Sequence, residues 1–148
     1  MVQELNNGIL VTPLKIIDNE KGEILHALKG SESSFLGFGE AYFSVVKSGN
    51  FKGWKKHTRM TLNLIVPLGA IRFYIVDQRS GLYVHSLLVS RENYCRLTVP
   101  PGVWLGFLGS GPGPNMLLNI ASIEHDPQEA ENQPPASFAH LFDDLNIR

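Results

Sequence analysis

The chain has 148 residues, with 13 Lys and Arg against 14 Asp and Glu and a formal net charge of −1. This length predicts a single domain spanning residues 1–148, with enough chain to bury a sizeable core. The nearly balanced charge argues against a nucleic-acid partner. Cys95 is the only cysteine, which excludes an intrachain disulfide and a thiolate metal cluster.

The termini and apolar runs bear on localisation. The first ten residues, MVQELNNGIL, carry an acid and lack the basic and apolar regions of a signal peptide. The most apolar run, LNLIVPLGAI at 62–71, is short and is interrupted by Asn63, Pro67 and Gly69. It is too short to cross a bilayer. We therefore expect a reduced, cytoplasmic protein without a membrane partner.

Short runs rich in Val, Ile, Tyr, Phe and Leu, each closed by Gly, Pro, Asn or Ser, predict about eight strands. In chain order the runs span residues 22–28, 40–46, 54–66, 70–77, 82–90, 94–99, 103–109 and 115–123. This spacing is typical of a β-sandwich or barrel, so the predicted fold class is all-β.

We expect the barrel core to cover about residues 20–125 and a polar tail to follow at 126–148. Within the tail, FAHLFDDL (138–145) has the pattern of a short amphipathic helix. Such a helix is expected to dock on the barrel or on a partner subunit.

The run 54–66 alternates between polar and apolar residues, and strand side chains alternate between two faces. One predicted face carries Lys55, His57, Arg59, Thr61 and Asn63. The other is mostly apolar and includes Trp54, Met60, Leu62, Leu64 and Val66. We expect the polar face to line a wet barrel lumen and the apolar face to be buried. Because the second face is more apolar than one small sheet needs, we also expect a homodimer.

Neighbouring strands repeat this two-faced pattern. Arg72 and Tyr74 share one face of 70–77, and Glu40, Tyr42 and Ser44 share one face of 40–46. A small barrel that holds a polar ligand in its lumen fits this description.

Charge is distributed unevenly along the chain. No Asp or Glu occurs from Ala41 to Val76, whereas this stretch contains six basic residues, namely Lys47, Lys52, Lys55, Lys56, Arg59 and Arg72. Most of the later acids lie beyond residue 123. A local positive region of this kind predicts a phosphate or diphosphate ligand.

Two motifs, KGWKKH (52–57) and PPGVW (100–104), resemble the cupin-type sugar-nucleotide epimerases and isomerases. The stretches GEAYFSVVKSGNF, IVDQRSG and NIASIEHDPQEAE follow the same order, so the resemblance covers roughly residues 20 to 131. The chain is similar to dTDP-4-dehydrorhamnose 3,5-epimerases and to dTDP-4-keto-sugar 3,4-ketoisomerases. The resemblance implies a double-stranded β-helix, the RmlC-like jelly-roll barrel of cupins, in a homodimer without a cofactor.

The resemblance also implies a function in deoxysugar and surface-polysaccharide biosynthesis. These enzymes act on a dTDP-4-keto-6-deoxyhexose, whose ketone acidifies the protons on the neighbouring carbons. A histidine base removes one proton, and a cation or hydrogen-bond donor holds the enolate oxygen. By resemblance, His57 is the base.

Three departures from the family pattern leave the remaining roles open. Lys55 stands where relatives often have a second histidine, no lysine follows Lys56, and no tyrosine follows Tyr94. The alternative is therefore a non-catalytic nucleotide-sugar-binding cupin that has lost the acid and the oxyanion partner. A structural protein that kept only the barrel is a third class, disfavoured by the positive region.

The expected site combines inherited and newly assigned residues. The expected catalytic residues are His57, Lys55 and Tyr42. The expected substrate-binding residues are Arg59, Arg72, Tyr74, Asn63 and Trp104. Arg59 and Tyr74 are also the alternatives to Lys55 and Tyr42 for holding the enolate and donating a proton. Arg72 suits a diphosphate or a cross-strand acid, and Trp104 suits ring stacking or the core.

A metal-binding cupin is disfavoured by the same residues. Such proteins bind a metal through His-x-His, a following glutamate and a histidine after Pro-x-Gly. This chain instead has Lys55-Lys56-His57, no acid between His57 and Asp77, and Leu105 at the last position. Since one histidine does not hold a transition metal, no metal is predicted.

Overall fold

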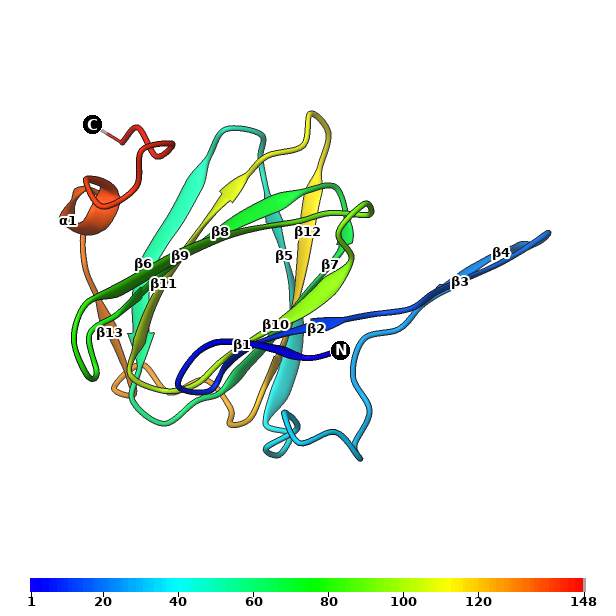
Figure 1. Cartoon of the computed structure of the whole chain (residues 1–148), viewed down its shortest axis with the longest axis horizontal. Coiled ribbons are helices and arrows are strands. Elements are labelled where there is room, and N and C mark those ends of the chain that lie inside the picture. The colour runs from blue at the N-terminus through cyan, green and yellow to red at the C-terminus, as the bar shows by residue number, and fades with distance from the viewer. Residues whose placement is uncertain (148) are drawn as a thin grey trace.

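The computed structural model describes residues 1–147 and contains two antiparallel β-sheets packed face to face (Figure 1). The first sheet consists of β1 (Gln3–Asn6), β2 (Ile9–Pro13), β10 (Cys95–Val99), β7 (Leu62–Leu68), β12 (Asn115–Ala121) and β5 (Glu40–Val46). The second consists of β13 (Ala130–Asn132), β6 (Phe51–His57), β11 (Val103–Gly109), β8 (Ile71–Asp77) and β9 (Tyr83–Val89). These sheets confirm the all-β prediction.

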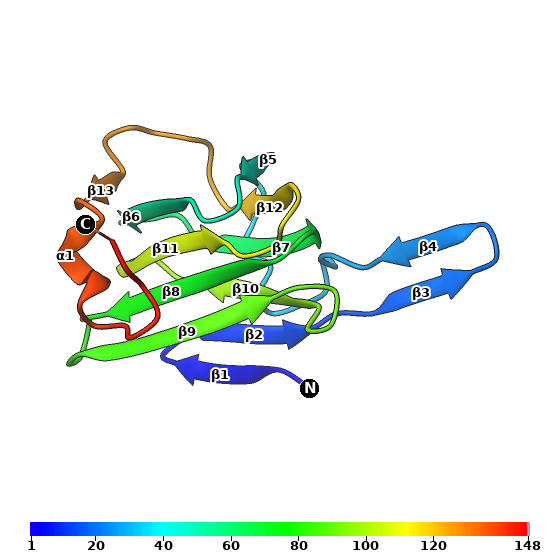
Figure 2. The same ribbon diagram turned by 90° about the horizontal axis from the view of Figure 1, so that it is seen from above.

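Two smaller elements complete the described chain. The strands β3 (Ile16–Asn19) and β4 (Gly22–Leu25) form a separate hairpin that projects from the body (Figure 2). The helix α1 (Ala136–Ala139) lies near the C-terminus. No helix within residues 1–147 is long and apolar enough to cross a membrane.

The predicted strand 54–66 is wrong, because the structure divides it into β6 and β7, which belong to different sheets. The chain leaves the first strand after His57. The N–H groups of Arg59 and Met60 then donate to Glu129 Oε2 at 2.8 and 2.9 Å instead of to a neighbouring strand. Arg59, Thr61 and Asn63 therefore do not continue the face that carries His57.

The core lies between the two sheets. Met60, Leu62, Leu64 and Val66 are all buried in it, packed against residues of the facing sheet such as Phe73. The apolar row that suggested a partner subunit is thus covered by this chain itself. It no longer supports a homodimer.

The barrel extends beyond its expected limits of residues 20–125. At the N-terminal end, β2 pairs with β10 in the first sheet, and β1 pairs with β2. At the other end, β13 pairs with β6, aligning Ala130 with His57 and Asn132 with Lys55. Short strands without strong alternation were missed by the sequence pattern, since their stability comes from these distant partners.

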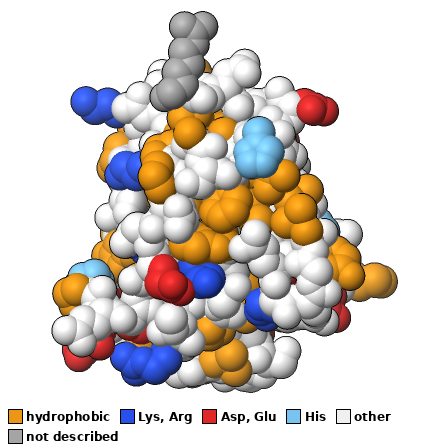
Figure 3. Space-filling model, turned by 90° about the vertical axis from the view of Figure 1, so that its left-hand side faces the viewer, with side chains coloured by type: hydrophobic (Ala, Val, Ile, Leu, Met, Phe, Trp, Pro, Cys, Tyr) orange, Lys and Arg blue, Asp and Glu red, His pale blue; other side chains and the backbone are white. Residues whose placement is uncertain are grey.

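The C-terminal segment after β13 packs on the outer face of the second sheet. Phe138 and Phe142 lie 5.4 and 6.0 Å from the ring of Trp54, and Trp54 Nε1 donates to the carbonyl of Pro135 at 2.8 Å. Figure 3 looks onto this face, where hydrophobic side chains gather. The helix predicted in 138–145 is shorter and earlier than expected, and this segment docks on its own barrel.

Candidate functional site

A cavity of about 290 Å³ opens between the two sheets. It is lined from β6 by Lys52, Lys55 and His57, from β5 by Tyr42 and Ser44, and from the other strands by Leu62, Leu64, Leu105, Phe107, Leu117, Asn119 and Asn132. Five of these residues are apolar, and the other seven bring polar groups that converge on the space. This composition is typical of a small-molecule site.

His57 is held by a buried carboxylate. Its Nδ1 lies 2.6 Å from Glu129 Oε1, and the two side chains are 13% and 1% exposed. The other oxygen of Glu129 accepts the N–H groups of Arg59 and Met60. The same carboxylate thus ends β6 and orients the histidine at the last position of that strand.

The ionisation of Glu129 determines which nitrogen of His57 carries a proton. Burial alone raises the pKa of Glu129, but hydrogen bonds from His57 and from two backbone N–H groups outweigh it and lower the pKa to about 2. An ionised carboxylate can only accept a hydrogen bond, so Nδ1 is the donor. In the neutral ring, Nε2 is left with a free lone pair.

The opposite wall of the cavity belongs to the first sheet. Tyr42 on β5 and Asn119 on β12 are aligned as cross-strand partners, and Asn119 Nδ2 donates to Tyr42 Oη at 3.1 Å. Because β6 lies in the other sheet, His57 and Tyr42 line the cavity from opposite sides. A ligand between them presents one face to each.

A register shift beside Gly53 brings two lysines to the cavity. Lys55 aligns with Leu105, but Gly53 already aligns with Gly106, so one residue of β6 bulges. Gly53 has a φ of +147°, and a Cβ there would lie 2.7 Å from the Cα of Gly106. As a result Lys52 and Lys55 both line the cavity, although three positions separate them.

Solved structures were compared with this fold. A dTDP sugar isomerase from Desulfovibrio desulfuricans is 35% identical over 86% of this chain and 84% of its own, with a TM-score of 0.82. The chain belongs to the RmlC-like family of dTDP-sugar epimerases and isomerases. This membership, together with the two facing sheets, confirms the predicted cupin jelly-roll barrel.

Two more distant structures share the fold of this RmlC-like protein. NovW, a 4-keto-6-deoxy sugar epimerase from Streptomyces spheroides, is 16% identical over 91% of this chain and 74% of its own, with a TM-score of 0.81. QdtA, a sugar 3,4-ketoisomerase from Thermoanaerobacterium thermosaccharolyticum solved with TDP, is 16% identical over 85% of this chain and 88% of its own, with a TM-score of 0.72. No protein-family model and no curated protein matches the chain.

Three predicted site residues of the RmlC-like chain come together in the cavity, namely His57, Lys55 and Tyr42. Arg72, Tyr74 and Trp104 do not. Arg72 and Tyr74 share a face as predicted, but that face is the outer one. There Arg72 pairs with Asp144 at 3.4 Å, while Tyr74 and Trp104 pack under the C-terminal segment.

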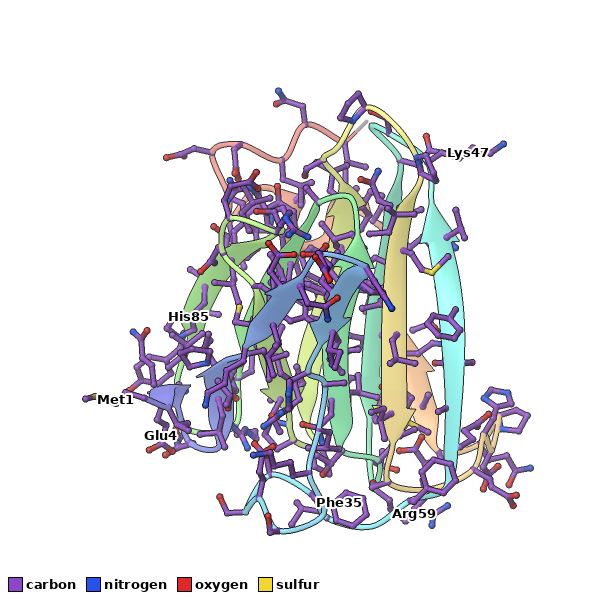
Figure 4. The ribbon with its side chains drawn as sticks, turned by 90° about the vertical axis from the view of Figure 1, so that its right-hand side faces the viewer. Met1, Glu4, Phe35, Lys47, Arg59 and His85 are labelled. Atoms are coloured by element: carbon purple, nitrogen blue, oxygen red, sulfur yellow. The ribbon has the colours of Figure 1, made fainter. Side chains whose placement is uncertain are left out.

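Asn63 and Arg59 also lie outside the cavity. Asn63 is buried on the outer side of β7, where it donates to the carbonyl of Ser34 at 2.9 Å and accepts from Thr98 Oγ1 at 2.6 Å. Arg59 pairs with Asp126 at 3.2 Å at the end of the molecule opposite Lys47 (Figure 4). The strand break after His57 turned both side chains away.

The basic stretch is not free of acids in space. The tail brings Glu131 to Lys56 at 3.1 Å, in addition to the acids that pair with Arg59 and Arg72. Within residues 1–147, Lys52 and Lys55 have no ion pair. Lys47 has no ion pair with the described residues either, but it does not line the cavity, so the unpaired positive charge at the cavity comes from Lys52 and Lys55.

Sequence reasoning missed two residues of this site, Glu129 and Asn119. Glu129 lies within HDPQEAE, a motif that carried the family resemblance but was assigned to a polar tail. Asn119 breaks the apolar alternation of 115–121 on its inward face, a signal that the pattern itself contained. Among the described residues, no three His, Cys, Asp or Glu side chains are grouped to hold a metal ion.

Glu129→Gln is expected to lower the free energy of unfolding at pH 7 by about 2 to 3 kcal/mol. The folded-state pKa of about 2 lies below the unfolded value of 4.5, so the carboxylate stabilises the fold fully above pH 5. This stabilisation is lost as the pH falls from 4.5 towards 2, where both states become protonated. Urea unfolding at a series of pH values measures the difference between wild type and variant.

Asp126→Asn is the matched control, since Asp126 pairs with Arg59 at an exposed position. It is expected to change the free energy of unfolding by less than about 1 kcal/mol. A wild-type minus Glu129→Gln difference that stays constant from pH 7 to pH 3 contradicts the assignment of an ionised, buried Glu129.

Proposed function

We propose that this chain is an active enzyme that removes a proton next to the ketone of a dTDP-4-keto-6-deoxyhexose. The observation that carries the proposal is the position of His57, on the wall of the cavity with its Nδ1 bonded to ionised Glu129. In its neutral form, a histidine oriented in this way presents Nε2 as a general base. Family membership supports the substrate class.

The reaction begins with a single proton transfer. The C–H bond beside the ketone breaks, its proton goes to Nε2 of His57, and the electron pair forms a C=C bond while the carbonyl oxygen becomes an enolate. No electron is gained or lost overall, so the step needs no redox cofactor. The buried Glu129 stabilises the imidazolium that forms.

Lys55 and Tyr42 are assigned the two remaining roles. Lys55 precedes His57 by two positions, the spacing of strand neighbours on one face, roughly 6 to 7 Å, which suits a contact with the enolate oxygen. Tyr42 lies on the opposite wall. A proton returned from Tyr42 inverts the carbon, whereas one returned by His57 to a neighbouring position gives isomerisation.

Isotope exchange tests this function. Wild-type protein in heavy water is expected to introduce deuterium at C3 or C5 of dTDP-4-keto-6-deoxyglucose, detected by mass spectrometry and NMR. Exchange needs only the base and the enolate contact, so it does not depend on the product formed. If the protein binds the nucleotide sugar without exchange, it is the non-catalytic cupin considered above.

We further propose a homodimer, now for a different reason from the one the sequence suggested. The outer face of β5 exposes Phe43 and Val45, and the projecting hairpin exposes Ile17 and Ile24. An isolated two-stranded hairpin is at best marginally stable in water. Packing of each hairpin on the exposed sheet face of a second copy covers both sets of side chains.

Light scattering at micromolar concentration is expected to give twice the mass of the 16.4 kDa chain. Phe43→Glu is expected to shift the protein to the monomer, because it places a charge in the proposed contact. Asp143→Lys, at an exposed position in the C-terminal segment on the other sheet, serves as the charge-change control. A monomer mass for the wild type overturns the proposal.

A further inference from the structure

Asn119 has a polar atom that its own protein leaves unsatisfied. Its side chain is 4% exposed and lines the cavity, and its Nδ2 donates to Tyr42 Oη. Its Oδ1 is buried and has no hydrogen-bond partner within residues 1–147. A buried carbonyl without a donor is unfavourable, and native proteins rarely retain one away from a ligand or water.

The presence of an unpartnered end does not depend on the orientation of the amide. If the oxygen and nitrogen of Asn119 exchange places, the hydroxyl of Tyr42 donates to the oxygen, and the nitrogen becomes the free group. In either orientation Tyr42 occupies one end of the amide, and the other end remains for a group inside the cavity. The orientation observed requires a hydrogen-bond donor there.

The surroundings limit what this donor can be. Leu62, Leu64 and Leu117 line the cavity on the same sheet and offer no donor. The polar side chains of the neighbouring strand β5, Tyr42 and Ser44, do not donate to this oxygen of Asn119. A cavity of about 290 Å³ suits a sugar ring but not a whole nucleotide sugar. The exposed lysines Lys52 and Lys55 suit the anionic remainder, whereas the buried amide suits an uncharged hydroxyl.

We propose that Asn119 is a specificity-determining residue, whose free amide oxygen accepts a hydrogen bond from a hydroxyl group of the substrate sugar. This inference rests on the proposed function, since it takes the sugar ring to lie between His57 and Tyr42. The contact favours sugars that carry a hydroxyl towards β12. Sugars that lack it leave the buried oxygen unpaired and bind more weakly.

Calorimetric titration with dTDP and with dTDP-4-keto-6-deoxyglucose tests the inference. Asn119→Leu is close to isosteric and removes both polar atoms. This variant is expected to bind the keto sugar about tenfold more weakly than the wild type and to bind dTDP with unchanged affinity. Leu118→Ala, a change at the next residue on the opposite face of β12, is the control and is expected to leave both affinities unchanged.

A second measurement uses the unaltered protein, in case the variant folds poorly. Nucleotide sugars that lack one ring hydroxyl are titrated in turn, and one of them is expected to bind the wild type about tenfold more weakly. For Asn119→Leu, removal of that same hydroxyl from the sugar is expected to cause no further loss of affinity. This pairing identifies the hydroxyl that the amide contacts.

The outcomes separate the inference from the proposed function. If the wild type binds neither dTDP nor the keto sugar, the proposed function fails, and the inference fails with it. If the wild type binds the keto sugar and folded Asn119→Leu binds it equally well, only the inference is overturned. The inference is also overturned if the folded variant loses the same factor of affinity for dTDP as for the keto sugar.

Discussion

His57→Asn is expected to reduce deuterium exchange into dTDP-4-keto-6-deoxyglucose by at least about 100-fold, the usual contribution of a general base. Asparagine keeps a side-chain N–H that can donate to Glu129, so the turn after β6 and the wall of the cavity are retained. It cannot take up a proton at neutral pH. The loss is expected in the rate of exchange, with the affinity for dTDP little changed.

Two neighbouring lysines provide the matched comparison. Lys55→Met is expected to slow exchange strongly, because Lys55 lines the cavity. Lys56→Met is expected to have little effect, since Lys56 faces outward, where it pairs with Glu131 and lies 5.0 Å from the ring of Trp104. Exchange that is unaffected by His57→Asn refutes the assignment of the base. Equal effects of the two lysine changes contradict the assignment of Lys55 to the cavity face of β6 and of Lys56 to its outer face.

Trp54→Ala is expected to lower the free energy of unfolding by about 3 to 5 kcal/mol, as for other fully buried large side chains. Trp54 is 1% exposed and lies at the centre of the contact between β6 and the C-terminal segment. Its removal leaves Phe138 and Phe142 without their main partner and frees the carbonyl of Pro135. Urea unfolding measures the loss, provided that the dependence of the unfolding free energy on urea concentration is the same for wild type and variant.

Trp54→Phe and Leu82→Ala bracket this result. Trp54→Phe retains most of the apolar contact but loses the hydrogen bond to Pro135, so a loss of about 1 to 2 kcal/mol is expected. Leu82 is exposed, and its change is expected to stay within about 0.5 kcal/mol. A loss below 1 kcal/mol for Trp54→Ala would show that the docked C-terminal segment contributes little to the fold.

Three of the residues that the sequence assigned to the site line the cavity, and the other five lie elsewhere. Alternation put Tyr42 with Ser44, and Arg72 with Tyr74, on common faces, and the structure agrees for both pairs. Alternation alone does not show which face is the lumen. For Arg72 and Tyr74 the outer face was itself covered, by a segment that lies some 70 positions further along the chain.

Glu129 illustrates the same limit for the chemistry. The family motif and the strand pattern both pointed to His57, but the carboxylate that orients it lies 72 positions later in the sequence. That carboxylate also accepts the N–H groups that end β6, which is why the predicted strand 54–66 is two strands. A prediction based on local periodicity extends a strand until a breaker appears, and residues 58–61 contain no Gly or Pro.

By itself, the sequence determined the all-β class, most of the strands, the family resemblance and the choice of His57 as the candidate base, because these depend on local periodicity and motif order. Only the tertiary structure decided which polar groups face the cavity, which acids neutralise the basic stretch and which carboxylate supports the histidine. The register shift at Gly53 and the strand break after His57 set the first, and the pairing of β13 with β6 and the docking of the aromatic segment on Trp54 set the other two. Contacts of this range depend on how the chain closes on itself, which no local pattern encodes.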